Sequence, residues 1–136
     1  MTDLHWMTAT QLVSAYRDKD LSPVDVAEYL LGRIDALDAQ INAFCLVDPE
    51  TTLAMARASE DRWMSGEPQG VLDGVPVAIK DLVVSKGWPT LRGSKTVDRN
   101  QPAEHDAPSV ARLRENGAVF IGTKGTTTGT HDSQMA

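Results

Sequence analysis

A short apolar run that ends in a lysine constrains the fold of this chain more than any other feature. The segment 75–79, Val-Pro-Val-Ala-Ile, is bounded by Gly74 on one side and by the charged pair Lys80 and Asp81 on the other. An apolar run of this length between a glycine and charged residues predicts a short buried strand rather than a helix. Pro76 has no N–H to donate to a strand ladder, so it suits the first position of that strand. The strand then ends on Lys80.

Two interpretations of Lys80 follow from its position. A lysine at the mouth of a buried strand is partly removed from water, and this favours the neutral amine, which accepts a proton. Most lysines are solvated, however, and on position alone Lys80 simply begins a surface loop. Asp81 either orients Lys80 or caps the following turn. A carboxylate partner would favour the charged lysine and oppose its use as a base, so the cap is the better interpretation of Asp81.

The periodicity elsewhere predicts an alternation of helices and strands. Ser22 followed by Pro23 is the best helix start in the chain, because serine caps the first N–H groups and proline fits the first helical position. Asp106 is expected to cap a later helix in the same way. The expected helices lie at 8–18, 23–41, 49–64 and 108–117, the expected strands at 44–47, 75–79 and 119–121, and a long irregular loop at 85–105.

Four motifs of this chain occur in a fixed order. Residues 41–44 read Ile-Asn-Ala-Phe, residues 72–81 read Leu-Asp-Gly-Val-Pro-Val-Ala-Ile-Lys-Asp, and residues 87–94 contain Gly-Trp-Pro-Thr and Gly-Ser. Residues 106–119 begin with Asp-Ala-Pro and end with Gly-Ala-Val. In this order the motifs resemble the amidase signature family, over roughly residues 8 to 128.

The resemblance implies an α/β fold, the N-terminal part of the amidase signature fold, with helices packed on a mixed β-sheet. We expect a single but incomplete domain over residues 1–136. Within it, residues 1–70 form an N-terminal helical layer, and residues 71–136 hold the lysine strand, a loop and the following helix and strand. Trp88 and Arg92 differ from what the family leads us to expect in the 87–94 loop. They either shape a substrate entrance or are surface variation, since loops vary most.

The family implies a Ser–cis-Ser–Lys triad, of which only the lysine maps onto this chain, as Lys80. In such a triad the neutral lysine takes a proton through a bridging serine, and the second serine attacks an amide carbonyl to form an acyl-enzyme. The serines that follow Lys80 are Ser85, Ser94, Ser109 and Ser133, and none lies in the Gly-Ser-Ser-Gly-Gly loop that carries the family's serines. The run 122–132 also departs from the family, which has Glu-Phe after its threonines. We therefore expect a fragment that is inactive by itself.

Three functions stay open. The first is an amidohydrolase that cleaves a small linear amide, with Lys80 as the base. The second is a subunit of the glutamyl-tRNA amidotransferase type, which shares the same motifs. The third is a non-catalytic module for binding or assembly, derived from the amidase fold. The missing serine pair supports the third, and an apolar face left without its neighbours would then lead the chain to form oligomers.

Composition excludes several other classes. The formal net charge is −6 and the acidic residues are spread out, whereas a nucleic-acid surface needs clustered Lys and Arg. The single cysteine, Cys45, rules out an internal disulfide and fits a reducing compartment. The N-terminus does not resemble a secretory signal, and no run approaches the ~20 apolar residues of a membrane helix, so we expect a cytoplasmic protein without a membrane partner. His105 and His131 lack ligand spacing, and we expect neither a metal nor a cofactor.

Overall fold

The structure is a computed structural model that describes residues 3–98 and 100–125. The threonine run after residue 125, His131 and Ser133 lie outside the described residues. In chain order the elements are η1 (Leu4–Trp6), α1 (Ala9–Arg17), α2 (Pro23–Ile41), β1 (Phe44–Leu46), α3 (Pro49–Met64), β2 (Pro76–Lys80), α4 (Pro108–Glu115) and β3 (Val119–Lys124). The α/β prediction is therefore confirmed, and η1 is the one element here that the sequence pattern did not predict.

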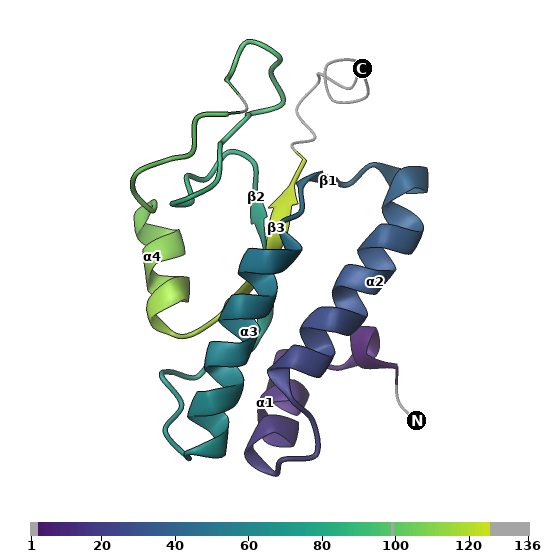
Figure 1. Ribbon diagram of the computed structural model, residues 1–136, viewed down its shortest axis with the longest axis vertical. Coiled ribbons are helices and arrows are strands. Elements are labelled where there is room, and N and C mark those ends of the chain that lie inside the picture. The colour runs from purple at the N-terminus through teal and green to yellow at the C-terminus, as the bar shows by residue number, and fades with distance from the viewer. Residues whose placement is uncertain (1–2, 99, 126–136) are drawn as a thin grey trace.

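The sheet is mixed, as predicted. Its order is β1-β3-β2, in which β3 runs antiparallel to β1 and parallel to β2. The long segment between β2 and β3 contains α4, and Figure 1 shows this segment beside the strands at the opposite side from α2. The β3 strand is buried from both sides: Val119 packs with Ala27 of α2 and Ala56 of α3, whereas Phe120 packs with Val110 of α4.

Side-chain caps determine where the helices begin. Thr8 and Gln11 form a reciprocal capping box at α1, and Ser22 and Asp25 form one at α2, with Pro23 at the first position. Asp48 accepts a hydrogen bond from the Thr51 N–H at the start of α3. These caps satisfy N–H groups that have no partner inside a helix.

The predicted cap of α4 is wrong. Ala107, not Asp106, is the N-cap of α4, and no side chain caps that helix. Pro108 stands at the first position and supplies no N–H, so α4 has one donor fewer to satisfy. Asp106 is instead held by the guanidinium of Arg114, with Nε–Oδ2 and Nη2–Oδ1 distances of 2.7 and 3.0 Å.

A buried carboxylate fixes the chain just before β2. Asp73 is fully buried and accepts two hydrogen bonds from Arg62 of α3, at 2.7 and 2.8 Å. It also accepts from the Ser59 hydroxyl and the Gln69 N–H. Gly117 lies against it so closely that an added Cβ would come within 2.7 Å of the Asp73 Cγ. Asp73 therefore joins α3, the loop before β2 and the turn before β3.

Tyr16 makes the corresponding link to α1. Its buried hydroxyl donates to the Gly74 carbonyl oxygen at 2.9 Å. Burial, and then the negative charges of Asp25 and Asp73, raise the pKa of Tyr16 above its usual range, so the phenol stays a donor at every ordinary pH. Gly74 has φ of 83°, where an L side chain is strained and would also meet Tyr16.

No helix among the described residues has the length and apolar character that crossing a bilayer requires.

We predict that Asp73→Ala lowers the free energy of unfolding by about 3 kcal/mol, because it leaves Arg62 and a backbone N–H without their partner. Urea unfolding followed by circular dichroism measures this. The control is Arg112→Ala, which removes an exposed ion pair with Glu115 and should cost less than about 0.5 kcal/mol. Equal losses in the two variants would contradict the role assigned to Asp73.

Candidate functional site

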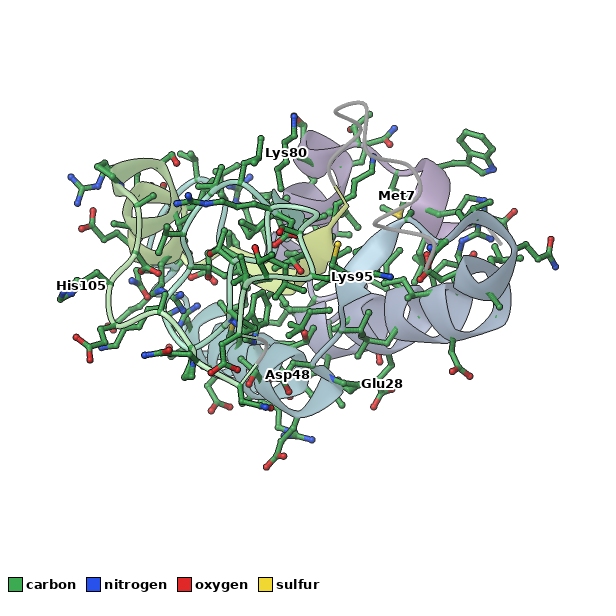
Figure 2. All side chains as sticks on the ribbon, turned by 90° about the horizontal axis from the view of Figure 1, so that it is seen from above. Met7, Glu28, Asp48, Lys80, Lys95 and His105 are labelled. Carbon is green, nitrogen blue, oxygen red and sulfur yellow. The ribbon has the colours of Figure 1, made fainter. Side chains whose placement is uncertain are left out.

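Lys80 is the last residue of β2 and lies at the carboxyl end of a parallel strand pair. It is in register with Lys124, the last residue of the neighbouring strand β3. In α/β sheets, ligands bind outside the carboxyl ends of the parallel strands. Figure 2 views the molecule from this end, and Lys80 lies at the periphery of the view. Its backbone position therefore suits a site residue.

The interpretation of Lys80 as a lysine partly removed from water is wrong for this chain. The lysine is exposed, and within residues 3–98 and 100–125 its side chain makes no hydrogen bond or ion pair. The cause is the one-sided burial of β2: Ile79 is buried, whereas Ala78 and Lys80 are exposed on the other face. The predicted buried strand is thus buried on only one face, and Lys80 belongs to the open face.

Asp81 organises the backbone directly after Lys80. Its N–H donates to the Lys124 carbonyl oxygen at 2.8 Å, and its own carbonyl accepts from the Arg92 N–H at 3.1 Å. The buried carboxylate accepts from the Leu91 N–H at 2.8 Å and the Gly93 N–H at 3.4 Å. Asp81 thus holds a loop ten residues further on, instead of capping the turn next to it as predicted.

The conformation of the loop explains how one carboxylate reaches two of its N–H groups. Arg92 and Gly93 both adopt left-handed φ values, 55° and 66°. Neighbouring N–H groups of a turn can point into one concavity, which suits an anion. Arg92 itself is exposed beside the end of β2. This geometry fixes residues 91–93 as one wall next to Lys80.

Trp88 belongs to the core, so neither predicted role fits it. Its side chain is 5% exposed and its ring lies 6.4 Å from the ring of Phe120. The indole N–H donates to Oδ2 of Asp48, at 3.1 Å. Trp88 therefore anchors the 85–105 loop to the start of α3 and does not form a substrate entrance.

The described serines after Lys80 do not form a nucleophilic pair. Ser85 is 2% exposed, and its hydroxyl has no hydrogen-bond partner among the described residues. The Ser94 hydroxyl lies 2.7 Å from the Thr96 hydroxyl, in the loop that Asp81 holds. Ser109 is exposed in the first turn of α4. None of the three hydroxyls is hydrogen-bonded to Lys80.

Two carboxylates that the sequence reasoning did not connect with the loop hold its ends. Asp48 accepts from Trp88, as above, and Asp106 accepts from the Lys86 N–H and from Arg114. A hydrogen bond from the Thr51 hydroxyl is the main cause that lowers the pKa of Asp48, with Trp88 adding to it. The Arg114 guanidinium lowers the pKa of Asp106. These partners lie up to 40 residues apart in sequence, so no local motif signals them.

A lysine at the carboxyl end of a parallel strand, beside a loop fixed by a buried carboxylate, defines a candidate site at the open edge of an α/β sheet. The sequence profile of the Amidase family matches residues 25–131. This chain therefore belongs to the amidase family.

Individual relatives agree with the family. The chain is 38% identical over 122 residues to the A subunit of the glutamyl-tRNA(Gln) amidotransferase of Chloroflexus aurantiacus, a match that covers 90% of this chain and 25% of that protein. It is 41% identical over 128 residues to the putative amidase AmiD of Mycobacterium tuberculosis, with 91% and 27% covered. The chain thus spans about a quarter of the length of the curated relatives it matches.

Solved structures share the fold. A bacterial aryl acylamidase of the amidase signature family superimposes with a TM-score of 0.83 at 26% identity, over 90% of this chain and 26% of that chain. A chain of a vestigial protein complex that reveals the evolutionary origins of an s-triazine catabolic enzyme gives a TM-score of 0.81 at 36% identity, over 88% of this chain and 26% of that one.

Acid should loosen the loop through its two carboxylate anchors. Because the pKa of Asp106 is lower in the folded chain than in the unfolded one, its stabilising effect is complete above about pH 4 and is lost as pH falls through the folded pKa. We predict that Asp106→Asn is less stable than the native chain near pH 6, and that the difference in stability shrinks as pH falls below about 4.

Urea unfolding at a series of pH values measures this difference. The control is Asp61→Asn, on the exposed face of α3, which should change the stability by less than about 0.5 kcal/mol. A difference between Asp106→Asn and the native chain that stays constant down to about pH 2 would show that the Asp106 charge is not the cause.

Proposed function

We propose that this chain supplies the general base, Lys80, of an amidohydrolase that cleaves a small linear amide by acyl transfer to serine. The observation that carries the proposal is the place of Lys80 at the carboxyl end of β2, in a chain of the amidase family. The open face of β2 leaves room for other groups to approach the amine, and the wall of residues 91–93 lies beside it.

In the proposed reaction Lys80 starts as a neutral amine. It takes the proton of a bridging serine, which in turn takes the proton of a second serine as that oxygen attacks the amide carbonyl. The C–N bond then breaks, the amine leaves with a proton from the same relay, and water releases the acyl group from serine. Backbone N–H groups would hold the oxyanion. Burial of Lys80 by the surrounding site would favour the neutral form that the first step needs.

A second candidate function has a specific observation in its favour. Several curated relatives at 38–42% identity are the A subunits of glutamyl-tRNA(Gln) amidotransferases. We therefore keep the alternative that this chain works as part of an amidotransferase of this kind, in which the same lysine would serve the release of ammonia from an amide. Co-purification of further subunits with the chain from its native host would favour this alternative, since a simple amidase needs none.

A non-catalytic module is the third candidate. The exposed side chain of Lys80 favours it. We also propose that the protein works in the cytoplasm, for which its single cysteine is the support. Exposed apolar residues such as Ile41 and Val71 support self-association.

The purified 136-residue chain should not hydrolyse amides. Acyl transfer needs a nucleophile within hydrogen-bond reach of its base, about 3 Å, and no described serine is bonded to Lys80. An assay with short aliphatic and aromatic amides tests this. Turnover by the chain that disappears in Lys80→Ala would contradict the prediction and make Ser85, Ser94 and Ser133 the serines to examine.

The role of Lys80 can be measured in a chimaera. The matching quarter of the bacterial aryl acylamidase is replaced by this chain, and kcat/KM is measured on an aryl amide. We predict that Lys80→Ala in the chimaera lowers kcat/KM at least about 100-fold, since it removes the general base.

Lys124→Ala is the matched control for that chimaera, because Lys124 is an exposed lysine in register with Lys80 on the neighbouring strand. Its kcat/KM should change less than about threefold, which is within the effect of a surface substitution. If both variants lose activity equally, or neither does, Lys80 is not the base.

A further inference from the structure

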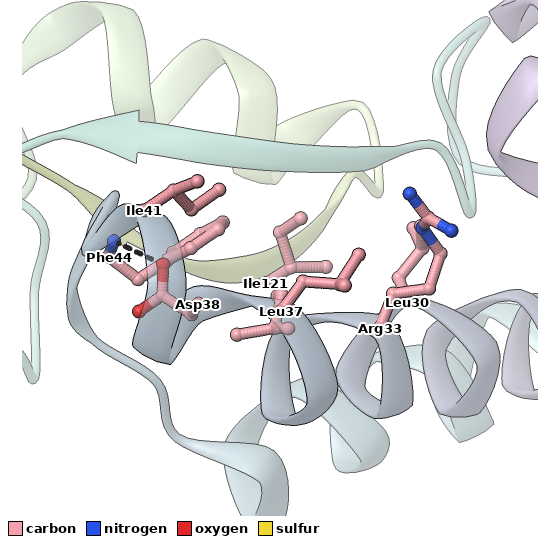
Figure 3. Close-up of a pocket in the computed structure, with 8 residues that line it drawn as sticks. Leu30, Arg33, Leu37, Asp38, Ile41, Phe44 and Ile121 are labelled. Carbon is pink, nitrogen blue, oxygen red and sulfur yellow. Dashed lines mark hydrogen bonds between the residues drawn. The ribbon is translucent and has the colours of Figure 1, made fainter.

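The strand β3 gives the end of β2 a fixed point of attachment. Figure 3 shows Ile121 of β3 beside Leu37 of α2, in a groove that the two elements line together. On the other face of β3, the buried Phe120 packs with residues of α4. β3 is thus held from both faces. The hydrogen bond from the Asp81 N–H to the Lys124 carbonyl oxygen therefore ties the end of β2 to a strand that is itself packed.

Lys80 has a fixed backbone but a free side chain. Its carbonyl oxygen accepts from the Val83 N–H at 2.9 Å, which closes a turn directly after β2. Within the described part of the chain, the lysine amine makes no hydrogen bond or ion pair. The four-carbon stem of a lysine is flexible, so the groups beside it determine where the amine lies. The wall of residues 91–93 lies next to this lysine and is such a group.

Three consecutive N–H groups of that wall donate to one residue, Asp81. The Leu91 and Gly93 N–H groups donate to its carboxylate, at 2.8 and 3.4 Å. The Arg92 N–H donates to its carbonyl oxygen at 3.1 Å. Because each of these N–H groups is occupied, the wall supplies no backbone donor for an oxyanion. Its contribution to a site is its position, and Asp81 sets that position.

A carboxylate is needed at position 81 because its two oxygens accept from two different N–H groups. Asp81 is 1% exposed, and no Lys or Arg side chain of the described residues forms an ion pair with it. A buried carboxylate without a cation is costly, and an asparagine would keep one acceptor oxygen at a lower cost. The aspartate thus holds the Leu91 and Gly93 N–H groups together, which an asparagine cannot do.

We propose that Asp81 is the positioning residue of Lys80: it holds the 91–93 wall beside the lysine stem, and so keeps the amine where a serine can reach it. This inference rests on the proposed function of Lys80 as the base. A misplacement of about 1 Å can slow an enzymatic step about 100-fold. Asp81 binds no part of the substrate in this role, so it acts on kcat and leaves KM nearly unchanged.

The aryl acylamidase chimaera tests this role with Asp81→Ala and Asp81→Asn, assayed on an aryl amide. The fluoride released when a fluorophosphonate probe reacts to completion counts the active sites, so that kcat refers to folded enzyme alone. Asp81→Ala should lower kcat at least about tenfold and change KM less than about threefold. Asp81→Asn keeps one acceptor oxygen for the Leu91 N–H, and it should lose less of kcat than Asp81→Ala does.

Asp106→Asn is the matched control. Asp106 anchors the same loop at its other end, through the Lys86 N–H, and lies outside the wall. The kcat per active site of Asp106→Asn should change less than about threefold. The pH profile of kcat/KM supplies a second measurement. Since Asp81 makes no bond with the Lys80 amine, the acid limb of the profile should lie at the same pH in Asp81→Asn as in the native chimaera.

Three results would overturn the proposal. The first is a kcat per active site that both Asp81 variants leave unchanged, which would give Asp81 a role in the fold alone. The second is an equal loss of kcat in Asp106→Asn. The third is an acid limb that moves to lower pH in Asp81→Asn while the maximal kcat stays the same, because Asp81 would then act through its charge on the pKa of Lys80. If Asp81→Ala does not fold, Asp81→Asn decides.

Lys80→Ala separates the failure of this inference from the failure of the proposed function. Activity that survives Lys80→Ala in the chimaera removes the proposed function. Activity that Lys80→Ala abolishes and Asp81→Ala keeps removes only the positioning role of Asp81.

Discussion

The hydrogen bond from the Asp81 N–H to the Lys124 carbonyl oxygen holds together the part of the molecule on which the candidate site depends. It extends the parallel pairing of β2 with β3 one residue beyond Lys80. The buried carboxylate of Asp81 then ties the 91–93 loop to the same point through the Leu91 and Gly93 N–H groups. A lysine that begins a free loop would have no fixed position. Here Asp81, the residue that follows Lys80, is hydrogen-bonded through both its N–H and its carbonyl oxygen.

The molecule uses buried carboxylates as structural centres on either side of β2. Asp73 precedes the strand and joins it to α3 and to the turn at Gly117, while Asp81 follows the strand and joins it to β3 and the loop. Each carboxylate accepts several hydrogen bonds, and this offsets the cost of removing its charge from water. The segment between Asp73 and Asp81 is therefore held rigidly at both ends. A group that transfers protons needs such a fixed position, because it must meet its partner within a few tenths of an ångström.

Much of this arrangement could be predicted from the sequence. Apolar periodicity and the cap at Ser22 located the helices and strands, because these signals are local. The motif order led to the amidase family, and the family profile confirmed it. The predictions that were wrong concern residues whose positions depend on contacts outside their local segment. Asp106 bonds to Arg114 rather than capping α4, Trp88 is buried against Phe120, and Lys80 is exposed because β2 is covered on only one face.

The role proposed for Lys80 is that of the base that activates a serine. A fluorophosphonate probe tests this role without substrate turnover, because the activated serine of the aryl acylamidase chimaera attacks the probe's phosphorus and displaces fluoride. We expect Lys80→Ala to slow this phosphonylation at least about 100-fold, and Lys124→Ala to leave its rate nearly unchanged. Phosphonylation of the Lys80→Ala chimaera at the native rate would show that Lys80 is not the base.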